Sequence, residues 1–134
     1  MTLSLCLIAA GKLTVLGATA FTLTWSHSVE RSAWEEDWRL TAQGLEIVEA
    51  RVKGSGAGMD PPEGAVFSGG WWRYRPAYKP LEQLRLATSM TVEPWQLCTP
   101  GACLTLPAEA GTEEVIVARC PSERQKSLSH IGER

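Results

Sequence analysis

The segment WSHSVERSAWEEDW, residues 25–38, concentrates the side chains of this chain that could bind a ligand or react. It holds three tryptophans, one histidine and four acidic residues. Imidazole and carboxylate groups set among indole rings perturb one another's protonation, and such groupings are frequent in binding sites. The segment therefore forms either a binding or catalytic site, or part of an aromatic core with charged residues on the opposite, solvent-facing side.

The alternation of β-strands predicts how these side chains are placed, because successive residues of a strand point to opposite faces. The odd-numbered residues of 21–29 form an apolar face that carries Trp25 and His27. The even-numbered residues of 34–40 form the matching face of the next strand and place Glu36 between two tryptophans. Glu35, Asp37 and Arg39 are expected to point the other way.

Two hairpins are expected to bring a third strand into the same row. A four-residue turn over 30–33 pairs Trp25 with Trp38 and His27 with Glu36, and a turn at 43–44 pairs Glu36 with Arg51. This register predicts a row His27–Glu36–Arg51 across three strands on the apolar face. Buried charges are tolerated when they are paired and hydrogen-bonded. The row therefore either lines a pocket at the open end of the sheet or forms a sealed polar network.

The segment GSGAGMDPP, residues 54–62, follows directly after this row. Its glycines allow close backbone approach, and successive N–H groups can hold an anion. It lacks the Lys-Ser/Thr pair of a phosphate loop, and a plain surface loop is the alternative. We expect a small anion such as a carboxylate to bind here. The binding residues would be Arg51 and Lys53 for charge, Ser55, Gly56 and Gly58 as loop donors, His27 and Glu36 to orient Arg51, and Trp25, Trp34 and Trp38 as walls.

Catalytic and metal chemistry fit the same residues less well. Ser26, His27 and Glu30 have the types of a hydrolase triad, but Ser26 and His27 point to opposite faces and no G-x-S-x-G turn is present. A metal would require His27, Glu36 and Glu49 as ligands, in competition with an arginine. We expect no enzymatic activity, no metal and no cofactor, and an esterase-like hydrolase ranks last.

Length and composition indicate one all-β domain. The chain has 134 residues, is 44% hydrophobic and carries a net charge of -2, so it can bury one core and lacks the basic surface of a nucleic-acid-binding protein. Short alternating segments between Gly- and Pro-rich turns predict a single-domain antiparallel β-sandwich, with a partly open β-barrel as the alternative. The expected strands are 2–7, 13–17, 21–29, 34–40, 45–53, 71–75, 84–88, 95–98, 103–106 and 115–118.

Two further expectations concern local structure and domain limits. Residues 81–86 could form a single helical turn in place of the start of a strand. The domain is expected over residues 1–120, and the polar segment 121–134 is expected to be a flexible tail.

The four cysteines are compatible with either an oxidising or a reducing cellular compartment. Cys98 and Cys103 flank the sequence TPGA, and a hairpin tip at 100–101 would bring them within disulfide reach. Cys6 and Cys120 then remain, one near each end of the domain. Disulfides would indicate an oxidising compartment, and buried free thiols are the alternative. The first residues lack the basic start of a signal peptide, and no run of eighteen apolar residues could span a membrane, which favours the cytoplasm.

Four stretches that follow one another in order, HSVERSAWEEDW, RVKGSGAGM, GWWRY and CTPGAC, resemble an uncharacterised bacterial family, a domain of unknown function. The similarity covers about residues 3–120. Members are often encoded beside TRAP transporters of the TAXI type, so the resemblance implies an accessory role in solute uptake. It implies a membrane or solute-binding subunit of the transporter as partner. Many relatives carry an N-terminal export or membrane segment, which implies a periplasmic location.

Together these observations predict a non-enzymatic binding or accessory protein whose ligand is a small organic anion, a transporter subunit, or both. The alternative is a structural or interaction protein in which the His-Glu-Arg row is only a core network.

Overall fold

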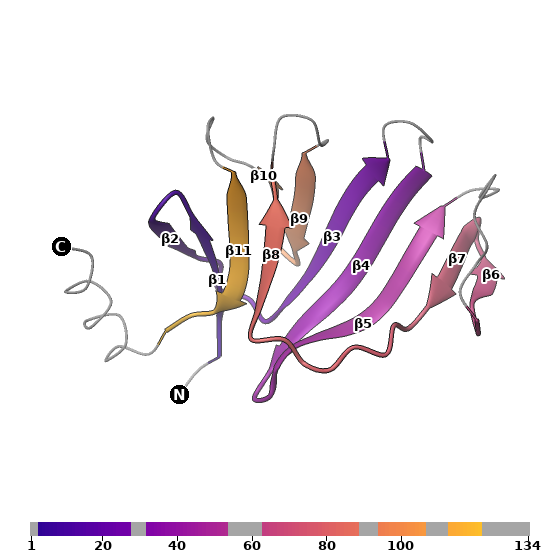
Figure 1. The fold of residues 1–134 in the computed structure, drawn as a ribbon, viewed down its shortest axis with the longest axis horizontal. Coiled ribbons are helices and arrows are strands. Elements are labelled where there is room, and N and C mark those ends of the chain that lie inside the picture. The colour runs from indigo at the N-terminus through magenta and orange to yellow at the C-terminus, as the bar shows by residue number, and fades with distance from the viewer. Residues whose placement is uncertain (1–2, 28–31, 54–62, 89–93, 107–112, 122–134) are drawn as a thin grey trace.

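The computed structural model describes residues 3–27, 32–53, 63–88, 94–106 and 113–121, without the side chains of Ser26, His27 and Ser32. These residues form two antiparallel sheets (Figure 1). The strands are β1 (Leu5–Ala9), β2 (Lys12–Val15), β3 (Ala20–His27), β4 (Ser32–Thr41), β5 (Gly44–Lys53), β6 (Val66–Ser68), β7 (Trp71–Tyr74), β8 (Gln83–Ala87), β9 (Trp95–Thr99), β10 (Ala102–Leu106) and β11 (Glu114–Arg119).

The two sheets make a β-sandwich, as the alternating segments predicted. The smaller sheet has the strand order β2-β1-β11-β8, and the larger has the order β10-β9-β3-β4-β5-β7-β6. They are separate sheets, so the partly open barrel does not apply. In Figure 1 the smaller sheet lies at one end of the molecule, and β7 and β6 form the opposite end of the larger sheet.

Each of the expected strands is present, and the structure adds β6, which the sequence reading missed. The helical turn considered for residues 81–86 is wrong, because β8 occupies most of this range. Leu81 instead bridges to Leu45 of the larger sheet through two backbone hydrogen bonds, of 2.8 and 2.9 Å. The segment before β8 is thereby held against the start of β5, which couples the two sheets.

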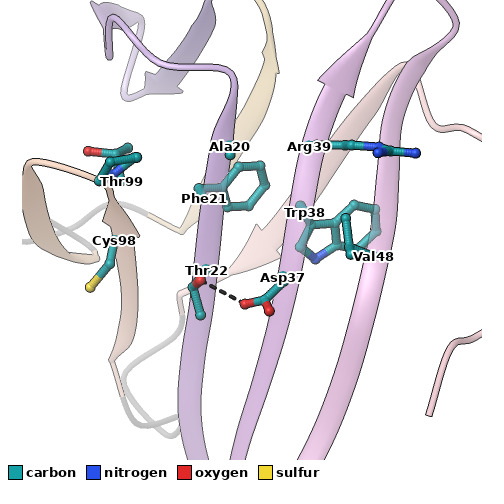
Figure 2. Close-up of a pocket in the computed structure, with 10 residues that line it drawn as sticks. Ala20, Phe21, Thr22, Asp37, Trp38, Arg39, Val48, Cys98 and Thr99 are labelled. Atoms are coloured by element: carbon teal, nitrogen blue, oxygen red, sulfur yellow. Dashed lines mark hydrogen bonds between the residues drawn. The ribbon is translucent and has the colours of Figure 1, made fainter. Parts of the chain in front are cut away.

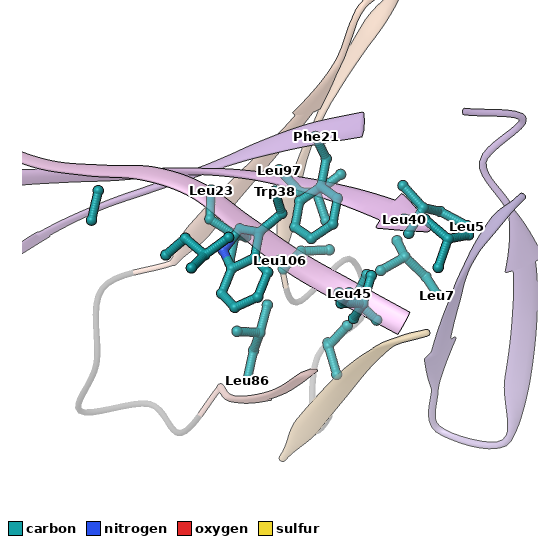
Figure 3. Packing of buried hydrophobic residues seen from close by; sticks show 14 residues of the cluster. Leu5, Leu7, Phe21, Leu23, Trp38, Leu40, Leu45, Leu86, Leu97 and Leu106 are labelled. Atoms are coloured by element: carbon teal, nitrogen blue, oxygen red, sulfur yellow. The ribbon is translucent and has the colours of Figure 1, made fainter. Parts of the chain in front are cut away.

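The core lies between the inner faces of the two sheets. Leu5, Leu7 and Leu86 of the smaller sheet face Leu40 and Trp38 of the larger one (Figure 3). Their side chains are at most 7% exposed, so each removes most of its apolar surface from water. This burial is what holds the smaller sheet on the larger one.

Gly44 begins β5 at a point where no larger residue fits. A Cβ atom there would lie 2.6 Å from the backbone oxygen of Leu81, and the φ angle is +130°. Both the close approach and the backbone conformation require glycine. The turn from β4 to β5 pairs Thr41 with Gly44 and Leu40 with Leu45, whereas the expected turn at 43–44 pairs Leu40 with Ile47, so the register at this turn differs from the expected one by two residues.

Two disulfides close the fold. Cys98 and Cys103 pair across β9 and β10, as their positions around the hairpin tip predicted. Cys6 bonds to Cys120, which joins β1 to the residue after β11, and the backbone N–H of Cys120 also donates to the Ser4 carbonyl. The free-thiol alternative is wrong, since none of the four cysteines is free.

Candidate functional site

The tryptophans singled out in the sequence do share the inner face of the larger sheet. Cross-strand pairing places Trp25 opposite Trp34, Trp34 opposite Val52, Val52 opposite Trp72, and Trp72 opposite Phe67. The rings of Trp25 and Trp34 stack with centroids 5.9 Å apart, and those of Phe67 and Trp72 are 5.0 Å apart. This aromatic row crosses five strands and continues to β9, where the Trp95 ring lies 4.8 Å from Trp25.

The register of the first hairpin differs from the expected one by four residues. Trp25 pairs with Trp34 and not with Trp38, and His27 pairs with Ser32 and not with Glu36. In the observed register Trp38 lies opposite Phe21, and their rings stack at 6.3 Å. Two aromatic pairs thus form where the expected register offers one, and each such pair stabilises a hairpin.

Glu36 lies on the inner face between the aromatic row and the core, opposite Leu23 on one side and Ala50 on the other. It accepts a hydrogen bond of 3.0 Å from the Trp38 indole N–H. Burial raises the pKa of Glu36 above its ordinary value, and the Trp38 hydrogen bond offsets part of this rise. Burial and the negative charge of Glu36 also raise the pKa of Tyr74.

Arg51 lies on the opposite face of the sheet from Glu36, so the predicted His27–Glu36–Arg51 row does not exist. A β-bulge in the β4–β5 pair is the reason: Trp38 pairs with Ile47, whereas Asp37 pairs with Glu49, and Val48 is the extra residue. One extra residue reverses which side chains face the core for the rest of the strand. Arg51 therefore pairs with Glu35 on the outer face.

On this outer face Arg51 is the centre of a carboxylate cluster. Its Nε donates to Glu35 at 2.7 Å, and its two terminal nitrogens form a fork on Asp37 at 2.8 and 3.1 Å. The nitrogen Nη1 also donates to Glu49 at 3.1 Å, and Glu49 in turn holds Arg73 at 3.4 Å. The Arg51 side chain is 13% exposed. The cluster contains three carboxylates and two guanidinium groups.

The protonation of the cluster follows from these contacts. The hydrogen bond to Asp37 is the largest cause that raises the pKa of Arg51 above its ordinary value, and Glu35 adds to it. Partial burial pushes the pKa of Asp37 upward, but hydrogen bonds from Arg51 and Thr22 hold that pKa below its ordinary value. Both groups stay charged at neutral pH. The Arg51 guanidinium already donates hydrogen bonds to carboxylates of the chain itself, so the predicted carboxylate ligand would have to compete with them for Arg51.

The other predicted anion-binding residues do not gather around Arg51. The Lys53 ammonium lies over the Trp71 ring, 5.8 Å from its centroid, also on the outer face. Ser55, Gly56 and Gly58 lie outside the described residues, as does the side chain of His27. The predicted site is thus divided between the two faces of the sheet, with Glu36 and the tryptophans on one and Arg51 and Lys53 on the other.

A shallow open pocket of about 450 Å³ lies beside the outer cluster (Figure 2). Thr22, Asp37 and Arg39 line it, and Cys98 and Thr99 of the neighbouring β9 form its far side. The Thr22 hydroxyl donates to Asp37 at 2.8 Å, the contact drawn in Figure 2. The pocket is wide and its charged groups are paired, so it resembles a surface depression more than an enclosed ligand site.

The feature that the sequence reading missed is the hairpin of β6 and β7 at the end of the larger sheet. Gly69 and Gly70 form its two-residue turn, with φ angles of +61° and +87°, values typical of a tight hairpin turn. Val66 and Phe67 in β6 are 62% and 53% exposed. A Gly-Gly pair between VFS and WWR is a hairpin signal that could have located it.

The described part of the chain contains neither a cluster of metal ligands nor a membrane-spanning helix. No group of three or more His, Cys, Asp or Glu side chains within those residues is placed to hold a metal ion. No helix with the length and apolarity to cross a membrane occurs in the same residues.

Comparison with protein families places the chain. The family described as "Domain of unknown function (DUF1850)" matches residues 21–106. The chain belongs to this family. Comparison with curated proteins and with solved structures found no match.

The DUF1850 match has clear limits in the structure. It begins at the second residue of β3 and ends with β10, and so contains all but one residue of the larger sheet, together with β8 and the Cys98–Cys103 disulfide. The strands β1, β2 and β11 and the Cys6–Cys120 disulfide lie outside it. The aromatic row, the Arg51 cluster and the β6–β7 hairpin all belong to the matched region.

Proposed function

We propose that this chain is a non-enzymatic accessory protein that binds a partner protein in an oxidising compartment, and that the partner is a subunit of a TRAP-type solute transporter. The observation that carries the proposal is the apolar edge of the larger sheet at β6. Val66 and Phe67 are more than half exposed there, at the end of the sheet away from the smaller one (Figure 1). A strand at the edge of a sheet that carries apolar residues and no charge or proline is a template for pairing with another chain.

The two disulfides support the oxidising compartment. Disulfides persist in secreted and periplasmic proteins and are rare in the cytosol, where thiols are kept reduced. Cys6–Cys120 closes nearly the whole domain and Cys98–Cys103 a single hairpin, so the two bonds serve different parts of the fold. This chemistry supports a periplasmic location, which agrees with the export segments of the family that the sequence resembles.

The transporter subunit as partner is supported by the resemblance to a family often encoded beside TRAP transporters of the TAXI type. The geometry favours a protein partner over a small organic anion. The Arg51 guanidinium that was expected to bind the anion is bonded to Glu35, Asp37 and Glu49 of the same sheet. A protein partner needs an exposed surface, which the β6 edge provides.

The test uses the purified protein with both disulfides formed. It is mixed with the purified solute-binding subunit, and separately with the membrane subunits in detergent, of a TRAP transporter from the same organism. We expect a stoichiometric complex by native mass spectrometry with one of them, and slower substrate uptake in cells that lack the protein. The proposal would be refuted if the protein formed a complex with none of the subunits and uptake was unchanged in cells that lack it.

A further inference from the structure

We propose that the partner supplies an extended segment that adds to the free edge of β6, with apolar side chains facing inward and acidic side chains facing outward. This inference rests on the proposed function and names the chemistry of the partner. Addition of a strand to an exposed sheet edge is a common mode of peptide recognition, in which backbone hydrogen bonds give affinity and alternate side chains give specificity.

The edge of β6 lacks the usual protection of an edge strand. In the described structure β6 is the last strand of the larger sheet and pairs on one side only, with β7. Proteins normally protect such edges with lysine, other charges or proline. The sequence of β6 is Val66-Phe67-Ser68, without any of these, whereas the edge strands β2 and β8 of the smaller sheet contain Lys12 and Arg85.

The inner side of this edge calls for an apolar residue. The aromatic row ends at Phe67, whose ring centroid lies 5.0 Å from that of Trp72, and Phe67 as a residue is 53% exposed. Side chains directly opposite each other in neighbouring strands are about 5 Å apart. A residue added next to Phe67 would therefore extend the row, and an aliphatic or aromatic side chain would cover the exposed part of the ring.

The outer side of the same edge calls for an acidic residue. Val66 lies opposite Arg73, and the Arg73 side chain leans toward β6, where its Nε lies 3.5 Å from the Ser68 carbonyl oxygen. Arg73 is 37% exposed and is held only at 3.4 Å by Glu49, so it can still bind a carboxylate. Lys53 is exposed on the same face, two strands from the edge.

The opposite edge of the same sheet provides a matched control. The strand β10 also has no charged residue, and its hairpin carries the Cys98–Cys103 disulfide. On the outer face Thr105 lies opposite Gln96 of β9, which carries no positive charge, whereas Val66 lies opposite Arg73. Thr105 is exposed on this edge, so Thr105→Asp places the same new charge there that Val66→Asp places on β6.

The test measures binding of a fluorescein-labelled peptide of about seven residues in which valine alternates with glutamate. We expect saturable binding by anisotropy, weakened about tenfold or more by Val66→Asp and by Phe67→Ser, and unchanged by Thr105→Asp. The same peptide with lysine in place of glutamate, or with alternate backbone amides N-methylated, is expected to bind much more weakly. Hydrogen exchange is expected to slow at residues 66–68 when the peptide binds. Circular dichroism checks that each variant is folded.

Several results would overturn the inference. They are equal binding of the N-methylated peptide, equal binding of the lysine peptide at low salt, or protection that maps away from β6. A concentration-dependent dimer that Val66→Asp abolishes would assign the edge to a second copy of this chain. If a transporter subunit bound the Val66→Asp variant as tightly as the unmodified protein, β6 would be refuted as the binding site, while the proposed function would stand. Conversely, peptide binding at β6 without binding to any subunit would refute only the transporter assignment.

Discussion

The two disulfides are expected to contribute very different amounts to stability, and the difference follows from how much chain each one closes. Cys6 and Cys120 are separated by 114 positions, and Cys98 and Cys103 by 5. A crosslink stabilises mainly by restricting the unfolded chain, and the effect grows with the logarithm of the loop length. The loop-entropy relation gives ~5 kcal/mol for the long link and ~2 kcal/mol for the hairpin link.

The measurement uses two variants that each retain one bond, Cys98→Ala/Cys103→Ala and Cys6→Ala/Cys120→Ala. Each is unfolded in urea, divided into oxidised and reduced samples, and refolded, so that reduction changes one bond and no side chain. Urea titrations followed by tryptophan fluorescence then give the free energy of unfolding. Reduction should cost ~5 kcal/mol, or the folded state itself, in the variant that keeps Cys6–Cys120, and ~2 kcal/mol in the other. Equal losses, or a larger loss for the hairpin, would refute the reasoning.

Three further substitutions test the geometry. Gly44→Ala should lower the free energy of unfolding by ~2–3 kcal/mol, because its Cβ would meet the Leu81 carbonyl oxygen at 2.6 Å. The control Gly101→Ala, whose Cβ meets nothing within 4 Å, should change the free energy of unfolding by no more than ~0.5 kcal/mol. Equal effects of the two substitutions in urea titrations would contradict this reasoning. Glu36→Gln should raise stability at pH 7 by a few tenths to about 1 kcal/mol, because Glu36 is only partly exposed and its raised folded pKa makes the unmodified protein lose stability as pH rises above the ordinary value of 4.5. That gain should vanish in acid, and a gain independent of pH would argue against burial as its cause. Arg51→Lys should cost ~1–2 kcal/mol, since an ammonium cannot form the fork on Asp37, and an NMR titration should show the Asp37 pKa rise toward 3.8. An unmoved Asp37 pKa would mean that the fork is not what lowers it.

The sequence predicted the fold well because alternation survives in most strands. The inner face of β3 and β4 is made of the residues that the alternation indicated, with Trp25, Glu36 and Trp38 among them. The hairpin at Cys98 and Cys103 was predicted from its turn residues alone. Periodicity of two is a local property, and it remains valid until the backbone inserts a residue.

The candidate site was predicted poorly because it depended on register, which alternation does not set. The bulge at Val48 moved Arg51 to the other face. Its signal was present, since Leu45 and Ile47 are apolar at odd positions whereas Val48, Ala50 and Val52 are apolar at even ones. The shift of the first hairpin had no such local sign, because it depends on which aromatic rings meet across the strands.

The covalent link between Cys6 and Cys120 also determines how the domain would be oriented on anything to which it is attached. Chain that precedes residue 6 and chain that follows residue 120 must leave the molecule beside each other, at β1 and β11. Figure 1 places these strands at the opposite end from β6. A tether at either side of the link would therefore hold the sandwich by one end and direct the β6 edge outward, and a force applied between the two chain ends would pass through the Cys6–Cys120 bond and not through the sheets.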